Sequence, residues 1–347
     1  MTEGAGTTAP TTQDVAQAAG VSLATVDRVL NGRPGVRAAT VARVRAAIER
    51  IGYVRDTAAA NLAKRRVYDL TFVLPDTENE FVASLRSEIA AQSTRPVLHR
   101  TQLRVTPVAP FDPQAVVAAL DAATGDGVAV FGPETPSVRD AVRRARGRGL
   151  AVVALVSDLP SSPRNHFVGI DNVRAGRTAA QLMGRFVPRP GRVLVLTGSR
   201  LARDHLERRQ GFDQVIADFP GMEVSASLEG RDDPDRVAAL LAEALTPDVV
   251  GIYSSAAGNA GLIRALGGRR DLTVIAHELT PTTRAALMDG TFDALITQDA
   301  GHLVRSAIRL LRAAADGAPF DPAQERIRID IHLKENVPDP GPTGGQT

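Results

Sequence analysis

The sequence predicts a small all-helical N-terminal domain followed by two α/β lobes built on parallel sheets. Two observations lead to this fold class. From residue 11 to about 66 the apolar residues recur at helical spacing. From Asp69 onward short β-branched runs alternate with longer helical stretches, which is typical of parallel sheets covered on both faces. Roughly 260 residues with this alternation exceed one open sheet, so we expect two similar lobes.

Three helices are expected in the N-terminal domain, and residues that start or stop helices bound each of them. They cover about 12–19, 23–30 and 38–51. Hydroxyl side chains can cap the first two, and Gly or Asn-Gly can end each helix. The boundary residues are Thr11 or Thr12, Gly20, Ser22, Asn31, Gly32 and Gly52.

Beyond Asp69 we expect strands that end at a shared cleft between two Rossmann-like lobes, because open α/β sheets bind ligands at the carboxyl ends of their strands. The strands are expected at Leu70–Leu74, Val97–Arg100, Gly127–Phe131, Ala151–Val156, Phe167–Ile170, Val193–Leu196, Val249–Tyr253, Thr273–Ala276 and Ala294–Thr297. The helices between them include Phe81–Gln92, Pro113–Ala123, Ser137–Arg146, Arg174–Phe186, Glu207–Ala217, Arg236–Ala244 and Ala260–Ala265.

Charge is distributed unevenly along the chain. Residues 1–66 hold ten Lys or Arg and five Asp or Glu, a net charge of +5, whereas the remainder has a net charge of −3. A basic block on a mildly acidic body indicates a polyanionic partner for the block alone. Cysteine is absent, which excludes disulfides, thiolate metal sites and cysteine nucleophiles. An aromatic content of 4% argues against stacking platforms for single-stranded nucleic acid.

Residues 13–31 read as a helix, a short glycine turn and a second helix, the pattern of a helix-turn-helix. The second helix of that motif enters the major groove of DNA, where the base edges are distinguishable. Leu23 and Ala24 are expected to contact thymine methyl groups, and Arg28 to bind a guanine in bidentate fashion. Short polar residues suited to phosphate contacts are Thr11, Thr12, Ser22, Thr25 and Asn31.

This segment resembles the lactose-repressor/galactose-repressor (LacI/GalR) family. The resemblance rests on TTQDVAQAAGVSLATVDRVLNG, followed by VRAATVARVRAAIERIGYVRDTAAANLA. It extends over about 11–337 through FVGIDNVRAGRTAAQLMGRF, DHLERRQGFDQVI, GNAGLIRAL and DALITQD. The later segments also resemble periplasmic sugar-binding proteins of the ribose type.

The resemblance implies a homodimer on a near-palindromic operator of double-stranded DNA. It also implies a hinge helix at 57–66 that folds on DNA, with Leu62 as a wedge in the minor groove. A buried contact of Leu62 against the core is the alternative. Asp27 departs from the Ser usual in the family. A carboxylate near phosphates is unfavourable, so Asp27 is expected either to orient Arg28 or to accept a hydrogen bond from cytosine.

The resemblance also implies an effector cleft that binds a small sugar or polyol. Carboxylates with Arg, Asn and Gln suit adjacent hydroxyl groups, and one aromatic ring can pack on the sugar. The residues carried over are Asn79, Phe81, Asp158, Arg208, Ser255, Glu278 and Gln298. Ser255 and Glu278 stand where the family usually has Asn and Asp. Each polar residue could instead cap a loop or join the lobes by a salt bridge.

Other polar residues receive simpler interpretations. Asp171 or Asn172 is expected to cap the helix Arg174–Phe186. The histidines lack metal-ligand spacing, so no metal or cofactor is expected, although His205 and His277 can approach the cleft.

The function that these features favour is that of a ligand-responsive transcriptional regulator, most simply a cytoplasmic repressor. GxSxG, Walker, GxGxxG and zinc motifs are absent from the sequence, which argues against an enzyme. A sugar-processing enzyme or a transport-type sugar-binding protein is the alternative. No apolar run is long enough for a membrane helix.

We expect five segments along the chain. They are a disordered tail at 1–10, the DNA-binding headpiece at 11–56, the hinge at 57–66, the bilobed core at 67–337 and a second disordered tail at 338–347. Within the core, the chain is expected to cross between lobes near 168–172, 297–300 and 318–324.

Overall fold

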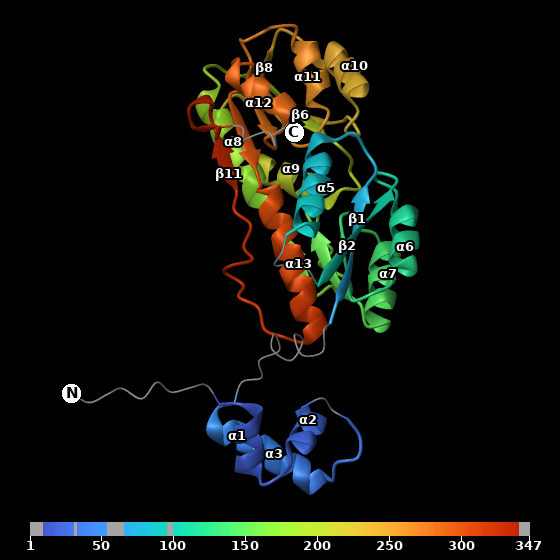
Figure 1. Cartoon of the computed structure of the whole chain (residues 1–347). Coiled ribbons are helices and arrows are strands. Elements are labelled where there is room, and N and C mark those ends of the chain that lie inside the picture. Colours follow the sequence, from blue (N-terminus) through green and yellow to red (C-terminus); the bar gives the residue numbers. More distant parts are fainter. Residues whose placement is uncertain (1–9, 31–32, 54–65, 96–99, 340–347) are drawn as a thin grey trace, which may run out of the picture. The chain divides into compact units, whose positions relative to one another are not determined.

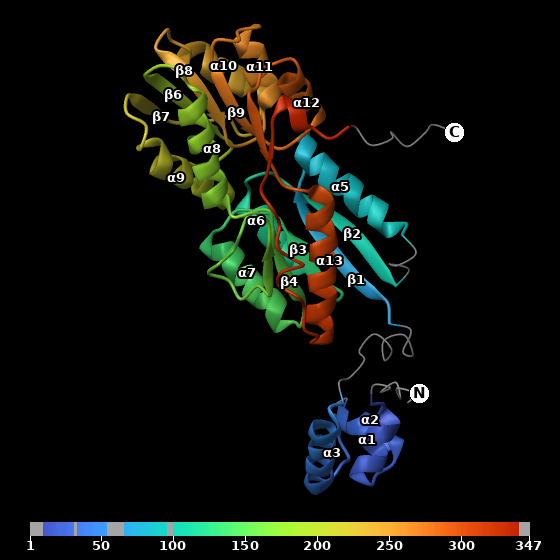
Figure 2. The ribbon, with the colours of Figure 1, turned by 90° about the vertical axis from the view of Figure 1, so that its left-hand side faces the viewer.

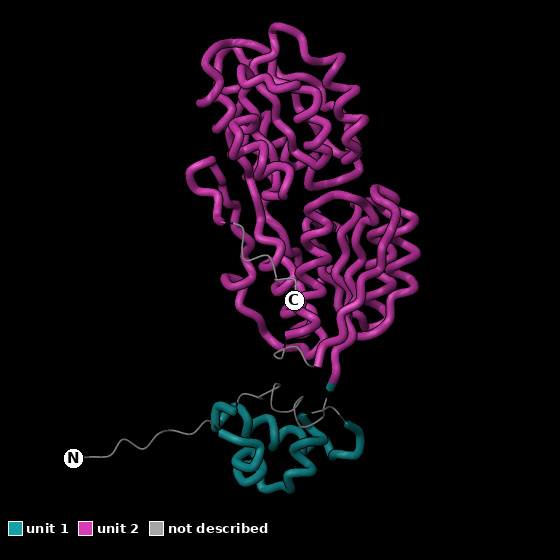
Figure 3. The backbone as a smooth tube through the Cα atoms, turned by 45° about the horizontal axis from the view of Figure 1, so that its top comes forward, with its two compact units in different colours: residues 1–66 teal, residues 67–347 magenta. Residues whose placement is uncertain are grey.

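The computed structural model describes residues 10–30, 33–53, 66–95 and 100–339. The chain divides into two compact units, residues 1–66 and 67–347 (Figure 3), and each is described here by itself. Asn31 and Leu62 lie outside the described residues, as do most of the expected hinge and most of both expected tails.

The first unit holds the three helices that the sequence predicts: α1 (Thr12–Ala19), α2 (Leu23–Leu30) and α3 (Ala38–Ile51). Thr11 and Asp14 form a reciprocal capping box at the start of α1, and Gly20 ends that helix in the left-handed conformation. The core consists mainly of Val and Ala, with Val26 fully buried between the helices.

The second unit begins with a lobe built on a five-stranded parallel sheet of order β2-β1-β3-β4-β5 (Figure 1). Its strands are β1 (Tyr68–Pro75), β2 (Thr101–Val108), β3 (Gly127–Val130), β4 (Ala151–Leu155) and β5 (His166–Val168). The helices of this lobe are α5 (Glu80–Ser93), α6 (Pro113–Ala122), α7 (Pro136–Gly147) and α13 (Ala300–Asp316). Helices α5 and α13 lie side by side on one face of the sheet, and α6 and α7 cover the other (Figure 2).

The second lobe repeats this topology. Its sheet has the order β11-β10-β9-β8-β6-β7, in which only β11 is antiparallel. The strands are β6 (Gly191–Thr197), β7 (Met222–Glu229), β8 (Val249–Ser254), β9 (Thr273–His277), β10 (Ala294–Thr297) and β11 (Asp330–His332). The helices are α8 (Asn172–Phe186), α9 (Arg203–Ile216), α10 (Pro234–Ala244), α11 (Asn259–Leu266) and α12 (Pro281–Met288), and a short 3-10 helix, η2 (Lys334–Asn336), follows β11.

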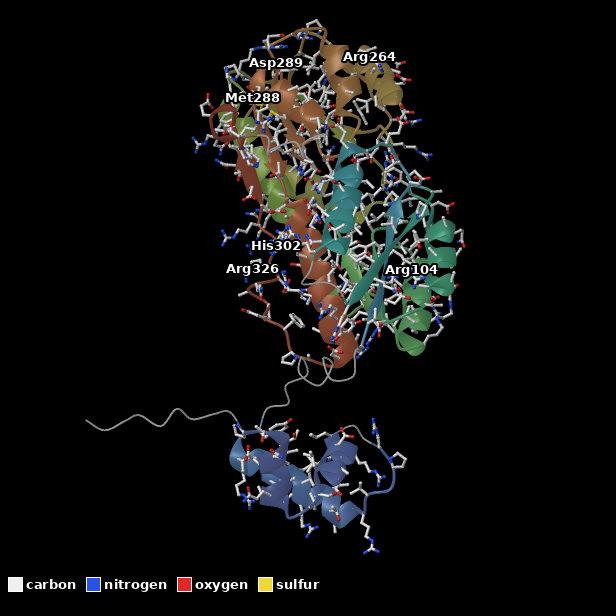
Figure 4. The ribbon with its side chains drawn as sticks, viewed as in Figure 1. Arg104, Arg264, Met288, Asp289, His302 and Arg326 are labelled. Carbon is white, nitrogen blue, oxygen red and sulfur yellow. The ribbon has the colours of Figure 1, made fainter. Side chains whose placement is uncertain are left out.

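The chain passes between the lobes three times, after β5, after β10 and after α13. The last passage is tied to α13 by side chains. The ring of His302 lies 3.1 Å from the carbonyl oxygen of Gln324, and Arg309 forms a bidentate ion pair with Glu325. Figure 4 labels His302 at the start of α13 and Arg326 on the returning segment.

The predicted fold class, helices followed by a bilobed core with two parallel sheets, is confirmed. The strands at the sheet edges are the exception. The strand expected at Val97–Arg100 falls mostly outside the described residues, the described strand β2 begins at Thr101, and β7 and β11 were not expected. All three are edge strands with few buried side chains, so they lack the continuous apolar run of a central parallel strand. No helix among the described residues has the length and apolar character needed to cross a membrane.

Candidate functional site

In the first unit, the start of α2 forms an exposed surface suited to DNA. Ser22 caps the helix by accepting a hydrogen bond from the backbone N–H of Thr25 at 3.2 Å. Leu23 is an apolar side chain that remains 48% exposed, and Ala24 and Arg28 are exposed beside it. Burial therefore does not account for Leu23, as it does for Val26 three residues further along the helix.

Asp27 forms an ion pair with Arg33. The Arg33 guanidinium lies 3.3 Å from the Asp27 carboxylate, and both side chains are more than half exposed. The expectation that Asp27 orients Arg28 therefore finds no support in this contact. The pairing offsets the negative charge of this carboxylate on α2.

In the second unit, the two lobes enclose a cavity of about 270 Å³ at the carboxyl ends of their strands. This is the position at which doubly wound sheets bind ligands. The lobe containing α5 contributes mainly apolar side chains, among them Phe81, Phe111 and Phe131. The other lobe contributes polar and charged ones, which are Asp204, His205, Arg208, Asp232, Asn259, His277 and Glu278.

Left-handed backbone conformations concentrate at this cavity. Among the described residues, the non-glycine positions with positive φ are Phe111, Val156, Arg231, Asp232 and Glu278. All of them except Arg231 line the cavity. Strained backbone of this kind costs free energy and persists where the fold requires it, often at binding sites.

These positions correspond between the two lobes. Phe111 (φ 56°) and Asp232 (φ 60°) each precede an Asp-Pro pair that begins a helix. Val156 and Glu278 share a φ of 65°, and each backbone N–H donates to a carbonyl of the neighbouring strand segment, at 2.8 and 2.9 Å. At equivalent positions, one lobe therefore presents apolar side chains and the other presents carboxylates.

Arg208 is held rigidly in the polar half of the cavity. Its side chain is 3% exposed. Its Nε donates to Oδ1 of Asn172 at 2.9 Å, and its Nη1 donates to the carbonyl of Ser255 at 2.9 Å. Nη2 lies 3.7 Å from the Glu278 carboxylate. The guanidinium thus retains free N–H groups directed by fixed neighbours.

Glu278 is buried beside Arg208, and burial raises the pKa of its carboxyl to about 6, although the Arg208 charge opposes the rise. The Gln298 amide donates to Glu278 Oε1 at 2.9 Å. Next to it, His277 has a pKa well below its usual range, because burial disfavours the charged ring, and the charges of Arg208 and His205 add to this. His277 is therefore neutral, and its Nε2 lies 2.9 Å from the hydroxyl of the buried Tyr253.

Four of the seven expected effector residues line the cavity: Asn79, Phe81, Arg208 and Glu278. The other three do not. Asp158 forms an ion pair with Arg164, with one N–O distance of 2.7 Å, which turns its carboxylate to a partner six residues along the chain. Ser255 is fully buried and donates to the carbonyl of Leu196, and Gln298 acts through Glu278.

Several cavity residues escaped the sequence analysis. His205 and His277 were expected near the cleft and do line it, but Asp204, Asp232 and Asn259 were not singled out. Asp204 lies four residues before Arg208, on the same face of α9, and this spacing is a signal that could have identified it. Either Asp171 or Asn172 was expected to cap α8. Asp171 is the cap, and Asn172 holds Arg208.

Direct contacts join the lobes around the cavity. The Asn79 amide donates to Asp232 at 3.1 Å, and the hydroxyl of Thr282 donates to Glu80 at 2.8 Å. An ion pair at 2.7 Å joins Glu134 of one lobe to Arg203 of the other. These contacts make the arrangement of the lobes depend on residues that also line or flank the cavity.

The described residues contain no cluster of three or more His, Cys, Asp or Glu side chains suited to a metal ion. The chemistry that the cavity offers is hydrogen bonding and charge pairing to one small molecule.

Comparison with protein families matches both units. Residues 11–56 match a family model described as bacterial regulatory proteins of the lacI family, and residues 70–319 match one described as a periplasmic binding protein domain. The chain is 29% identical over 215 residues to the HTH-type transcriptional regulator AglR of Rhizobium meliloti, covering 59% of this chain and 57% of the relative.

Two further relatives match shorter stretches. Identity is 43% over 75 residues with catabolite control protein A of Priestia megaterium, covering 22% of this chain and 23% of the relative. It is 32% over 161 residues with the regulator reg1 of Streptomyces lividans, covering 46% of each chain. The chain therefore spans between a quarter and somewhat over half of the length of these relatives.

Solved structures share the fold of the second unit. A solute-binding protein of Burkholderia graminis, in complex with D-arabinose, superimposes with a TM-score of 0.71 at 22% identity, over 78% of this chain and 96% of that one. The glucose-galactose binding protein GanP of Geobacillus stearothermophilus also has a TM-score of 0.71, at 20% identity over 79% and 99% of the two chains.

Proposed function

Because the chain belongs to the LacI family of bacterial regulatory proteins and carries a periplasmic binding protein domain, we propose that it is a transcriptional regulator controlled by a small sugar or polyol. The family is one of regulators and not of enzymes. The observation that carries the proposal is the combination of an exposed helix-turn-helix with a ligand-sized cavity between two lobes in one chain.

The DNA-binding half of the proposal assigns base contacts to Leu23, Ala24 and Arg28, and phosphate contacts to the short polar residues of α1 and α2. Two copies of the chain would bind the two halves of a near-palindromic operator, as a cytoplasmic homodimer. Repression is the simplest outcome, since a protein bound at an operator obstructs transcription.

The effector half rests on the size and chemistry of the cavity. A volume of about 270 Å³ lies at the lower end of the range for ligand pockets and suits one sugar ring better than two. Arg208 and Glu278 can bind adjacent hydroxyl groups, and Phe81 can pack against the apolar face of the ring. Several structural relatives are named for monosaccharides, which agrees with this size.

For effector binding to change operator binding, the effector must bind one arrangement of the two lobes more tightly than the other. The contacts of Asn79 with Asp232 and of Glu80 with Thr282 join the lobes at the cavity itself. A ligand that alters these contacts changes the relative stability of the two arrangements, and thereby the operator affinity.

The experiment is a pair of substitutions with opposite expected effects, measured on DNA flanking the protein's own gene after a thermal-shift screen of sugars and polyols. Arg28→Ala is expected to weaken operator discrimination by roughly 1–3 kcal/mol and to leave effector binding intact. Arg208→Ala is expected to abolish the effector response and to leave operator binding intact. Fluorescence anisotropy measures the operator affinity of each variant, and calorimetry measures its affinity for the effector.

The alternatives predict different results. An enzyme would consume the ligand, and a transport-type binding protein would bind sugar without any effect on DNA. Unchanged operator affinity in the Arg28 variant would contradict the DNA-contact assignment. Wild-type sugar affinity in the Arg208 variant would show that the effector site lies elsewhere.

A further inference from the structure

Two buried polar atoms at the cavity lack a hydrogen-bond partner in the described structure. One is Oδ1 of Asp204, and the other is Nδ1 of His277. Both side chains are only 2% exposed, and both residues line the cavity. A buried carboxylate oxygen without a donor is costly, so Asp204 is prepared to accept a hydrogen bond from a bound molecule.

The neighbours of Asp204 cannot supply that donor. His205 Nε2 lies 3.6 Å from the other carboxylate oxygen, which is beyond hydrogen-bond range. The Nδ1 atom of the same ring accepts a hydrogen bond from the backbone N–H of Ser199 at 3.2 Å, so this nitrogen does not donate to Asp204. Arg208, one turn further along α9, donates to Asn172 and to the Ser255 carbonyl, and its Nη2 lies near Glu278.

The charges that line the cavity also favour a ligand that donates hydrogen bonds from a positively charged group. Among the described residues that line it, Arg208 is the only Lys or Arg, whereas five carry carboxylates: Glu78, Glu80, Asp204, Asp232 and Glu278. Both lobes contribute to this excess of negative charge, since Glu78 and Glu80 belong to the α5 lobe and Asp204, Asp232 and Glu278 to the other. An anionic sugar, such as a sugar phosphate, would meet repulsion here.

We propose that the effector carries a protonated amino group that binds Asp204, and that the effector class is an amino sugar. This inference rests on the proposed function, because it names the ligand of the same cavity. The ammonium group donates to the unpartnered Asp204 oxygen in a charge-assisted hydrogen bond. The hydroxyl groups face Arg208 and Glu278, and the apolar face of the ring lies against the Phe81 side of the cavity.

The test compares matched sugars by titration calorimetry on the full chain. The pairs are D-glucosamine with D-glucose, D-galactosamine with D-galactose, and D-mannosamine with D-mannose. N-acetylglucosamine and glucose 6-phosphate complete the set. We expect one amino sugar to bind roughly tenfold or more tightly than its parent sugar, because a hydrogen bond between charged groups is worth at least that factor. N-acetylation, which removes the charge, and phosphorylation are expected to abolish binding.

Substitution of Asp204 then assigns the effect to one carboxylate. Asp204→Asn keeps the shape of the side chain and is expected to remove the preference for the amino sugar over its parent. Asp213→Asn is the matched control, because Asp213 lies on the same helix, is exposed and pairs with Arg209. The control is expected to bind as the wild type does, and the melting temperature of each variant checks that it is folded.

Other outcomes overturn the inference. If a neutral sugar binds as tightly as its amino counterpart and releases the operator, the inference fails while the proposed function stands. If Asp204→Asn retains the full preference, Asp204 does not bind the amine. If no sugar of the set binds, the inference fails together with the monosaccharide assignment, whereas operator binding by the first unit is measured independently.

Discussion

At the scale of single residues, Glu278 is the buried group whose protonation matters most to the second unit. It lies in a left-handed backbone conformation with Gln298 and Arg208 as its polar neighbours. Burial penalises its charged form more than Arg208 stabilises it, so the pKa rises from 4.5 to about 6. The native state therefore binds this proton more tightly than the unfolded chain does.

The free energy of unfolding is expected to fall as the pH rises through this range. Glu278 contributes stability that is complete below pH 4.5 and is lost as the pH passes about 6. A shift of about 1.5 units corresponds to about 2 kcal/mol. Relative to Glu278→Gln, the wild type should therefore lose about 2 kcal/mol between pH 4.5 and 7. Urea unfolding followed by circular dichroism measures the difference, and parallel pH profiles would contradict it.

At the scale of elements, the pair α8 and α9 sets the position of the polar half of the cavity. The helices approach so closely that a Cβ atom at Gly176 would lie 1.9 Å from the carbonyl oxygen of Arg208. A Cβ at Gly211 would lie 2.0 Å from the carbonyl oxygen of Val173. Glycine is required at both positions because backbone meets backbone.

Gly176→Ala is accordingly expected to separate the helices. We expect a loss of stability of roughly 1–3 kcal/mol or more from overpacking, together with weaker effector binding, because α9 carries Arg208. Thermal unfolding and calorimetry measure the two effects. Gly147→Ala, at the end of α7, is the control, since a Cβ there meets no atom within 4 Å. It should be neutral or slightly stabilising, and an equal loss in both variants would refute the packing argument.

At the scale of the second unit, the lobe arrangement depends on contacts across the cavity mouth. Arg203 binds two carboxylates, Glu134 on the opposite lobe at 2.7 Å and Glu207 on its own helix at 2.7 Å. Only the first of these contacts opposes separation of the lobes. Substituting each carboxylate in turn therefore distinguishes the loss of a contact between the lobes from the loss of a contact with Arg203 within α9.

Glu134→Gln is expected to weaken effector binding by about twofold to fivefold, since the closed arrangement that holds the ligand loses an ion pair. The effect is modest because the Arg203 side chain is 36% exposed. Glu207→Gln should leave the affinity within about twofold of the wild type. Calorimetry on both variants decides the matter, and equal losses would show that the bridge between lobes is not the cause.

The sequence by itself determined the elements and their order. Caps, glycine stops and hydrophobic periods act within a few residues, so the three N-terminal helices and the central strands could be predicted closely. Edge strands such as β2 and β7 could not be predicted in this way. Their side chains are partly exposed to solvent, so their sequences lack the continuous apolar run that indicates a buried strand.

The tertiary structure decided which polar side chains meet at the cavity. Asn79, Arg208 and Glu278 were identified in advance from the family resemblance, and Asn79 and Glu278 each follow a strand at its carboxyl end. Asp158 occupies such a position as well, yet it pairs with Arg164, whereas Oδ1 of Asp204 has no hydrogen-bond partner in the described structure. Whether a carboxylate is paired locally or left for a ligand depends on distances between loops that are far apart in sequence. Only the packing of the two lobes sets those distances.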